Sequence, residues 1–209
     1  MSRGRFISFE GGEGAGKSTQ VALLAEALTS RGIGCLSTRE PGGSRGAEEI
    51  RQLLVQGDVG RWDSMCEALL HFAARRDHVT TVIEPALQDG TWVICDRYTD
   101  STVAYQGHGQ GLDITFIKNL HRTATNDLWP DLTIILDVPV AEGFDRISSR
   151  ATGDDRYERM DGEFHTRLRA GFLEIAAQDP PRCAVVDSRQ TTEDVHREIV
   201  ELVEKRLGL

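Results

Sequence analysis

Eight residues, from Gly11 to Ser18, have the types and spacing of a phosphate-binding loop. Their order is Gly-Gly-Glu-Gly-Ala-Gly-Lys-Ser, preceded by an apolar run and followed by a helical pattern. Glycines let successive backbone N–H groups turn toward phosphate oxygens, Lys17 adds a positive charge, and the Ser18 hydroxyl can ligate the Mg²⁺ that bridges two phosphates. The motif predicts a nucleoside triphosphate site.

A chance match is the alternative interpretation, because glycines are common in the turn between a strand and a helix. The chain contains only three lysines, Lys17, Lys118 and Lys205, among 24 basic residues. A lysine at the one position where the motif requires it therefore argues for a phosphate site. The expected binding residues are Gly11, Gly12, Glu13, Gly14, Ala15, Gly16, Lys17, Ser18 and Thr19.

Charged residues follow two further apolar runs. Arg39 follows the run 35–38 and precedes a Glu-Pro-Gly-Gly turn, and Asp96 and Arg97 follow the run 92–95. Parallel strands bring their carboxyl ends to one edge of a sheet, so we expect these side chains near the phosphate loop. Asp96 can serve the Mg²⁺ through water, and both arginines can bind anions. A turn-stabilising Arg39 and an Asp96–Arg97 ion pair are the structural alternatives.

A helical segment and the residues after the third run carry groups suited to a nucleoside. Phe72 and Arg76 are four residues apart, so a ring and a guanidinium on one helix face can stack on a base and hydrogen-bond it. A core Phe72 with Arg76 reaching out beside it is the local alternative, which this segment alone favours. Ser101, Tyr105 and Gln106 supply hydroxyl and amide groups for a base or sugar.

Four arginines surround the stretch 151–155, which has no apolar period: Arg146, Arg150, Arg156 and Arg159. Its turn-forming and charged residues predict a mobile loop over residues 150–158. Arginines on such a loop can close over a triphosphate and offset the charge that spreads on a transferred phosphoryl group. A solvated run of charges is the ordinary alternative.

Size and charge restrict the domain count and the partners. A chain of 209 residues is long enough for one α/β domain and short for two, so we expect one domain over 1–209. The net charge of -9 and the pI near 5.2 argue against nucleic acid. Four widely spaced cysteines without a CxxC pair indicate reduced thiols and no zinc, and no run suits a signal peptide or membrane span. We therefore expect a cytoplasmic protein without a membrane partner.

Five apolar runs alternate with helical patterns along the chain, at 6–9, 35–38, 92–95, 132–136 and 183–186. Val21, Leu24 and Leu28 follow the first run at helical spacing, and Val195 and Ile199 follow the last. This alternation predicts an α/β fold of the P-loop NTPase type, a doubly wound five-stranded parallel sheet with helices on both faces. Ligands bind at the carboxyl ends of such strands, where the motifs lie.

The abundance of arginine suggests that the acceptor of the phosphoryl group is itself an anion. A hydroxyl acceptor generally needs a catalytic base, whereas a phosphate monoester is mostly dianionic near neutral pH, with a second pKa of about 6. Such an acceptor needs its charge offset, which Arg39, Arg97 and the loop arginines can do. Glu13 lies inside the anion-binding loop, where it can contact an acceptor hydroxyl, orient an arginine or point to water.

With these residues assembled, the chain closely resembles the thymidylate kinases. Matching segments cover nearly the whole chain: 9–20, 39–43, 72–78, and Asp96-Arg97-Tyr98-x-x-Ser101-x-x-Ala104-Tyr105-Gln106, which is the signature that distinguishes the family. The resemblance implies transfer of the γ-phosphoryl group of ATP to dTMP, giving dTDP and ADP for dTTP biosynthesis, with Mg²⁺ as cofactor.

The resemblance also implies roles in binding the base of dTMP. Phe72 stacks on thymine, and Arg76 with Gln106 or Ser101 bonds its polar edge. These implied roles favour the functional interpretation of Phe72 and Arg76 over the core one.

For the rest of dTMP, the resemblance implies that Arg39 and Arg97 hold the acceptor phosphate. Glu13 lies near the 3′-hydroxyl, and Tyr105 crowds the position of a 2′-hydroxyl, which favours deoxyribose.

Family members differ in where a catalytic arginine resides, either in the phosphate loop after its acid or in the later lid. Here Gly14 follows Glu13, so the resemblance implies the lid subclass, with the choice between Arg150 and Arg156 open. It further implies a homodimer formed through helices on one face. The implied catalytic residues are Glu13, Lys17, Arg97, Arg150 and Arg156.

Two other function classes compete with this interpretation. A deoxynucleoside kinase or another monophosphate kinase shares the loop and the Asp-Arg pair, and phosphorylation of thymidine but not dTMP would favour it. A nucleotide-gated switch is poorly supported, because the sequence has no Asn-Lys-x-Asp base reader and no Asp-x-x-Gly after a strand. A transporter-type ATPase lacks its Leu-Ser-Gly-Gly-Gln segment.

Overall fold

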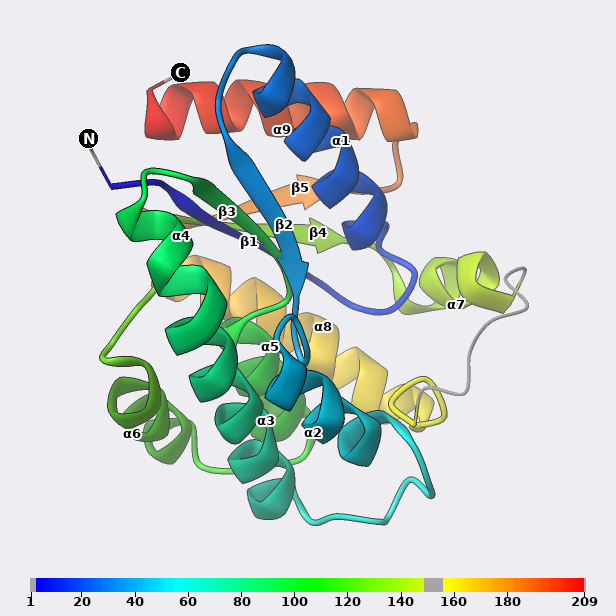
Figure 1. Cartoon of the computed structure of the whole chain (residues 1–209). Helices are drawn as coiled ribbons and strands as arrows, with labels where there is room; N and C mark the ends of the chain where they lie inside the picture. Colours follow the sequence, from blue (N-terminus) through cyan, green and yellow to red (C-terminus); the bar gives the residue numbers. More distant parts are fainter. Residues whose placement is uncertain (1–2, 149–155, 209) are drawn as a thin grey trace.

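A parallel sheet forms the centre of the computed structural model, which describes residues 3–148 and 156–208. Its five strands follow the spatial order β2-β3-β1-β4-β5 (Figure 1). Their bounds are β1 Phe6–Glu10, β2 Cys35–Arg39, β3 Trp92–Asp96, β4 Leu132–Asp137 and β5 Cys183–Asp187. The predicted five-stranded parallel sheet is confirmed.

Each strand runs one residue beyond the apolar run that predicted it, and that last residue is charged. The five are Glu10, Arg39, Asp96, Asp137 and Asp187. The parallel register sets Arg39 opposite Asp96 and Asp137 opposite Asp187. One edge of the sheet therefore gathers the charged ends of all five strands, and this is the edge where parallel sheets bind ligands.

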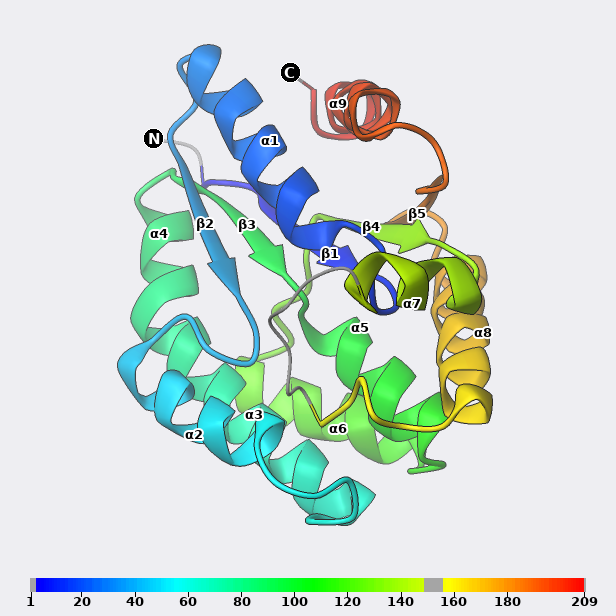
Figure 2. The same ribbon diagram turned by 90° about the vertical axis from the view of Figure 1, so that its right-hand side faces the viewer.

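Helices cover both faces of the sheet, as predicted. On one face α1 Lys17–Ser30 and α9 Thr192–Leu207 lie side by side (Figures 1 and 2). The opposite side carries α2 Arg45–Val55, α3 Ser64–His78, the π-helical turn η1 Val79–Ile83, α4 Glu84–Gln88, α5 Thr99–Thr102, the π-helical segment η2 Val103–Gly109, α6 Ile114–Thr125 and α8 Gly162–Gln178. Beyond the sheet edge, α7 Val140–Ser148 lies beside the loop that precedes α1. Among these described helices none has both the length and the apolar character needed to cross a bilayer.

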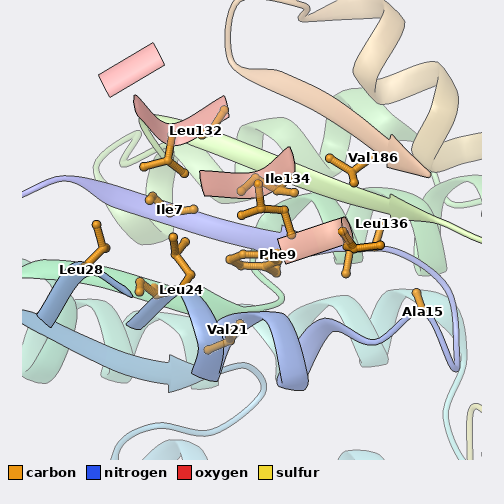
Figure 3. Packing of buried hydrophobic residues seen from close by; sticks show 14 of the residues in the cluster. Ile7, Phe9, Ala15, Val21, Leu24, Leu28, Leu132, Ile134, Leu136 and Val186 are labelled. Carbon is orange, nitrogen blue, oxygen red and sulfur yellow. The ribbon is translucent and has the colours of Figure 1, made fainter. Parts of the chain in front are cut away.

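The central strand β1 is buried on both of its faces. Ile7 and Phe9 point toward α1 and pack with Leu24 (Figure 3). Phe6 belongs to a second core on the opposite side, together with Val93. Side chains alternate along a strand, so a strand covered on both faces needs successive apolar residues. Each buried side chain of this kind stabilises the fold by about 1.5–3 kcal/mol, which keeps the loops at the sheet edge in fixed positions.

The start of α1 differs from the starts of four other long helices. Side chains of Ser44, Asp63, Asp161 and Thr191 cap the first turns of α2, α3, α8 and α9 by accepting a backbone N–H. No side chain caps α1, which follows Gly16 in the left-handed conformation with a φ of 86°. Its first N–H groups are left to a ligand, and the positive end of a helix dipole favours an anion there.

Candidate active site

A pocket of about 270 Å³ opens at the carboxyl edge of the sheet. Its wall combines the loop before α1, the end of β2, one face of α3 and the segment after β3. The predicted site residues that line it are Glu13, Gly14, Ala15, Gly16, Lys17, Ser18, Thr19, Arg39, Asp96, Arg97, Ser101, Tyr105 and Gln106. Residues distant in sequence are thus gathered at one place because they follow neighbouring parallel strands.

Lys17 is folded back onto the loop that carries it. Its Nζ donates to the carbonyl oxygens of Gly11 at 3.1 Å and Gly12 at 2.7 Å. Burial and the nearby Arg97 lower the pKa of Lys17 to about 8, although Glu13 partly offsets them. At pH 7 the ammonium is protonated, and a positive charge held at the phosphate loop suits a phosphate anion.

Gly14 permits the phosphate loop to lie directly against α7. A Cβ atom at Gly14 would be 2.0 Å from the carbonyl oxygen of Gly143, and one at Gly143 would be 2.4 Å from that of Glu13. Gly14 also has a φ of 69°, which disfavours any residue with a side chain. The loop therefore has no room for a side chain at the position after its acid.

Glu13 and Arg97 form an ion pair that bridges the loop after β1 and the segment after β3. The Arg97 Nη2 donates to Glu13 Oε1 at 3.0 Å, and the Tyr105 hydroxyl donates to the same oxygen. Burial would raise the pKa of Glu13, but Arg97, Lys17 and Tyr105 outweigh it and lower that pKa. Glu13 is therefore ionised and orients Arg97, one of the roles that the sequence left open.

The backbone of Arg97 adopts a conformation that is rare for a residue with a side chain. Its φ is 69°, in the left-handed region, and its N–H donates to the Phe9 carbonyl at 2.9 Å. Such a conformation costs on the order of 1 kcal/mol or more. It turns the guanidinium toward the phosphate loop, where Nη1 donates to Gly11 O at 3.0 Å. Arg97 thus pairs with Glu13 rather than with its neighbour Asp96.

Asp96 instead meets the hydroxyl of Ser18. Ser18 Oγ donates to Asp96 Oδ2 at 2.6 Å at the mouth of the phosphate loop. A hydroxyl and a carboxylate are oxygen ligands, which Mg²⁺ prefers, and the metal usually takes its remaining ligands from water and substrate phosphates. The two residues fit a magnesium site beside a bound triphosphate.

Arg39 lies on the pocket wall in contact with an acid on α2. Its Nη2 donates to Glu48 Oε1 at 3.0 Å and Oε2 at 3.1 Å, and its side chain is 55% exposed. The Gly43 N–H, followed by Arg39 and Arg51, lowers the pKa of Glu48 despite some burial. Arg51 also lines the pocket and donates to Pro41 O at 2.7 Å. Sequence reasoning did not find Arg51, because only the fold brings α2 to this wall.

The structure places Phe72 and Arg76 away from the pocket, which differs from the prediction. Phe72 is only 2% exposed and packs in a core, and Arg76 donates to Ala124 O at 3.1 Å on the outside of α3. His71 and Arg75 line the pocket instead. Successive residues of a helix are rotated by about 100° around its axis. A shift of one position along α3 therefore moves a side chain from the core side to the pocket side.

Arg75 is buried and presents one nitrogen without a partner. Its Nε donates to Glu40 Oε2 at 2.7 Å, and Nη2 donates to Tyr98 O at 3.1 Å and Thr102 Oγ1 at 3.2 Å. Its Nη1 is buried with no hydrogen-bond partner among the residues described. An unpaired buried donor is costly, which indicates that this nitrogen is reserved for a ligand.

His71 and Gln106 complete this end of the pocket. A ring nitrogen of His71 lies 3.1 Å from the Tyr157 hydroxyl, and Gln106 Nε2 donates to Glu67 Oε2 at 2.9 Å. Burial and the charges of Arg75 and neighbouring arginines lower the pKa of His71 to about 3, so its ring is neutral at physiological pH. A neutral ring, an amide and a free guanidinium nitrogen together can hold a planar heterocycle.

Arg156 does not line the pocket, but it contacts two residues that do: its backbone N–H donates to Val55 O at 3.1 Å, and its Nη2 donates to the Tyr157 hydroxyl at 3.2 Å. It is 1% exposed, its Nη2 lies 2.6 Å from Glu67 Oε1, and it donates to the carbonyl oxygens of Leu54 and Val59. These partners belong to α2 and α3 and the connection between them. Arg150 and residues 151–155 of the predicted loop lie outside the described part of the chain.

Comparison with known proteins gives a consistent result. A sequence profile described as thymidylate kinase matches residues 9–199. The chain is 53% identical over 208 residues to a thymidylate kinase of Afipia carboxidovorans, covering 99% of this chain and 91% of the relative. It is 49% identical over 209 residues to one of Caulobacter vibrioides, covering 100% of both. A crystal structure of thymidylate kinase from Ehrlichia chaffeensis is similar at a TM-score of 0.78 and 37% identity, covering 96% of this chain and 99% of that one.

Proposed function

The chain belongs to the thymidylate kinase family, and from this premise we propose how its pocket divides between two nucleotides. The protein transfers the γ-phosphoryl group of ATP to dTMP, giving dTDP and ADP. The proposed division into a donor half and an acceptor half rests on the ion pair of Arg97 with Glu13. The side chain of Arg97 extends from the end of β3 to Glu13 in the phosphate loop. The donor lies on the loop side of this ion pair and the acceptor on the α3 side.

The donor half is the uncapped start of α1 with the loop before it, residues 11–19. Its backbone N–H groups hold the β- and γ-phosphates, and Lys17 turns from the Gly12 carbonyl onto them. Ser18 and Asp96 would hold Mg²⁺ beside them. The metal would supply positive charge that offsets the charge of the donor phosphates.

The acceptor half begins with the phosphate of dTMP. Arg97 and Arg39 bind this phosphate, for which Arg39 leaves the exposed contact with Glu48. Glu13 keeps Arg97 in place and lies near the 3′-hydroxyl, while the buried ring of Tyr105 leaves little room for a 2′-hydroxyl. A monophosphate is already anionic, so these residues supply charge compensation and alignment rather than a general base.

The base of dTMP lies deeper, against α3. The geometry supports His71 as the ring beside thymine and Arg75 Nη1 as the donor to one of its carbonyl oxygens. Gln106 and Ser101 lie on the same wall. We assign to His71 and Arg75 the roles that the resemblance gave to Phe72 and Arg76, because only the former pair reaches the pocket.

The lid supplies the catalytic arginine, and we assign this role to Arg150. Gly14 leaves no space for a side chain in the phosphate loop, so an arginine cannot come from there. The buried contacts of Arg156 hold it on α2 and α3. An arginine at the transferred phosphoryl group stabilises the charge that develops there.

Dimerisation and location complete the proposal. Leu53 on α2 and Met65 and Leu69 on α3 are exposed apolar side chains on two packed helices, and they support a homodimer formed through this face. All four cysteines are free thiols, which supports a reducing cytoplasmic location. We further propose that residues 1–209 form one kinase domain.

ADP release from ATP should depend on dTMP. With Mg²⁺ present, dTMP should support the fastest release, and thymidine should support none because it lacks the acceptor phosphate. Lys17→Ala should lower kcat by at least about 100-fold, since it removes a charge that stabilises the transferred group, while the circular dichroism spectrum is unchanged. Faster release with thymidine than with dTMP would identify a deoxynucleoside kinase instead.

Arg75→Lys should raise the KM for dTMP about tenfold, because a lysine lacks the nitrogen that faces the base and one lost hydrogen bond corresponds to about 1.4 kcal/mol. The matched variant Arg76→Lys, one residue along α3, should stay within about twofold of the parent protein. Steady-state kinetics with saturating ATP measures both. A larger rise in the KM for dTMP in Arg76→Lys than in Arg75→Lys would contradict the assignment and favour Phe72 and Arg76 as the residues that bind the base.

The two lid arginines should behave differently when removed. Arg150→Ala should lower kcat about 1,000-fold with no change in melting temperature, as expected for an arginine that acts on the transferred group. Arg156→Ala should lower the free energy of unfolding by about 3–5 kcal/mol, because it removes the positively charged partner of the buried Glu67. Urea denaturation and single-turnover kinetics separate the two effects, and a stable, inactive Arg156→Ala variant would contradict the assignment.

Sedimentation equilibrium should give twice the chain mass of 23.1 kDa. Leu69→Glu should reduce this mass to that of one chain, since it places a charge in the proposed interface. Leu173→Glu on α8 is the matched control, because Leu173 is also exposed but lies on another helix. A monomeric parent protein would rule out the dimer at the concentration tested.

A further inference from the structure

A buried acid that the proposed function leaves without a role lies beneath the phosphate loop. Glu10 is the last residue of β1, precedes Gly11 and has no solvent exposure. A buried carboxyl group destabilises a protein unless its oxygens are hydrogen-bonded. The partners of Glu10 therefore indicate what this acid does at the centre of the sheet edge.

Both partners of Glu10 belong to the segment that follows β3. The backbone N–H of Tyr98 lies 2.7 Å from Oε1, and the Ser101 hydroxyl lies 2.5 Å from Oε2. The Ser101 hydroxyl in turn accepts from Arg97 Nη1 at 3.3 Å. The carboxyl group of Glu10 thus links Tyr98 and Ser101, the two ends of the turn that directly follows Arg97.

The neighbouring acid, Asp100, has an arginine as its partner. Arg182 Nη1 and Nη2 donate to its two carboxylate oxygens at 2.6 Å and 3.1 Å. Glu10, by contrast, has a backbone amide and a hydroxyl as its hydrogen-bond partners in the described structure. Glu10 therefore does not pair with the guanidinium group of Arg97, which contacts Glu13 and lines the pocket.

We propose that Glu10 is a positioning residue for Arg97: by fixing Tyr98 and Ser101 it holds the left-handed turn that aims this guanidinium at the acceptor phosphate. The inference rests on the proposed role of Arg97 in binding dTMP. A turn with a φ of 69° at a non-glycine residue relaxes unless its surroundings hold it. Glu10 supplies that restraint from the strand to which the phosphate loop is attached, so it fixes the two loops relative to each other.

The protonation of Glu10 suggests the conservative variant. Burial and the nearby Asp100 raise its pKa to about 8, so the group is mainly protonated at pH 7. A glutamine matches a protonated glutamate in shape, accepting from Tyr98 N with its oxygen and donating to Ser101 Oγ with its amide. Methionine has a similar length and has neither group, so it removes the restraint without leaving a large cavity.

Isothermal titration of full-length protein with dTMP, thymidine and ATP tests the inference at pH 7. Glu10→Met should weaken dTMP binding at least tenfold and change the affinities for thymidine and ATP less than threefold. Thymidine lacks the phosphate, so its affinity reports on the contacts with the base and the sugar alone. Glu10→Gln should bind dTMP within threefold of the parent protein.

A double-mutant cycle with Arg97→Ala distinguishes positioning from general damage. If Glu10 acts through Arg97, adding Glu10→Met to Arg97→Ala should weaken dTMP binding less than twofold further. Full additivity, or an equal loss of thymidine affinity in Glu10→Met, would overturn the inference. Should Glu10→Met fail to fold, Glu10→Asp replaces it: the shortened carboxyl group cannot reach both partners, so the same selective loss is expected, and parent-like dTMP affinity would overturn it.

Failure of the underlying proposal gives a different result. If Arg97→Ala alone binds dTMP as tightly as the parent protein, the assignment of Arg97 to the acceptor phosphate is wrong, and the inference about Glu10 falls with it. If Arg97→Ala loses affinity but Glu10→Met does not, only the inference about Glu10 is wrong.

Discussion

The ion pair between Glu13 and Arg97 is the contact on which the geometry of the pocket depends. It joins two loops that follow neighbouring strands, β1 and β3, and its partners differ by 84 positions in the sequence. The pair lies between the loop that suits a triphosphate and the wall of α3 that suits a base. Arg97, Lys17 and Tyr105 keep Glu13 ionised, and Arg97 has a left-handed backbone conformation, so the protein itself constrains both partners of the pair.

The sequence predicted those parts of the protein that depend on local patterns. Apolar runs located all five strands, since a strand buried on both faces must be apolar throughout. The spacing of Gly11 to Ser18 located the uncapped helix start, and the charged residues after the second and third runs placed Arg39, Asp96 and Arg97 on the pocket wall. The rule that parallel strands end at one edge was enough to bring these segments together.

The parts that the sequence did not predict depend on helix rotation and on long-range pairing. On α3 two pairs share the same spacing, 71 with 75 and 72 with 76, and only the packing of Phe72 in the core determines which pair faces the pocket. The charged residues around Arg156 in the sequence predicted a lid residue. In the structure Arg156 pairs with Glu67, which lies 89 positions earlier in the chain. Such an ion pair has no local signature, and neither has the position of Arg51 on the wall.

The contact of Gly14 with Gly143 has a consequence for redesign of this enzyme. Two backbones touch there without intervening side chains, so the phosphate loop and α7 constrain each other's shape. An arginine side chain after Glu13 would collide with the backbone of Gly143 and push α7 outward. Placing an arginine in the phosphate loop of this protein therefore requires changes in α7 as well as the substitution at Gly14, because the two segments are in backbone contact.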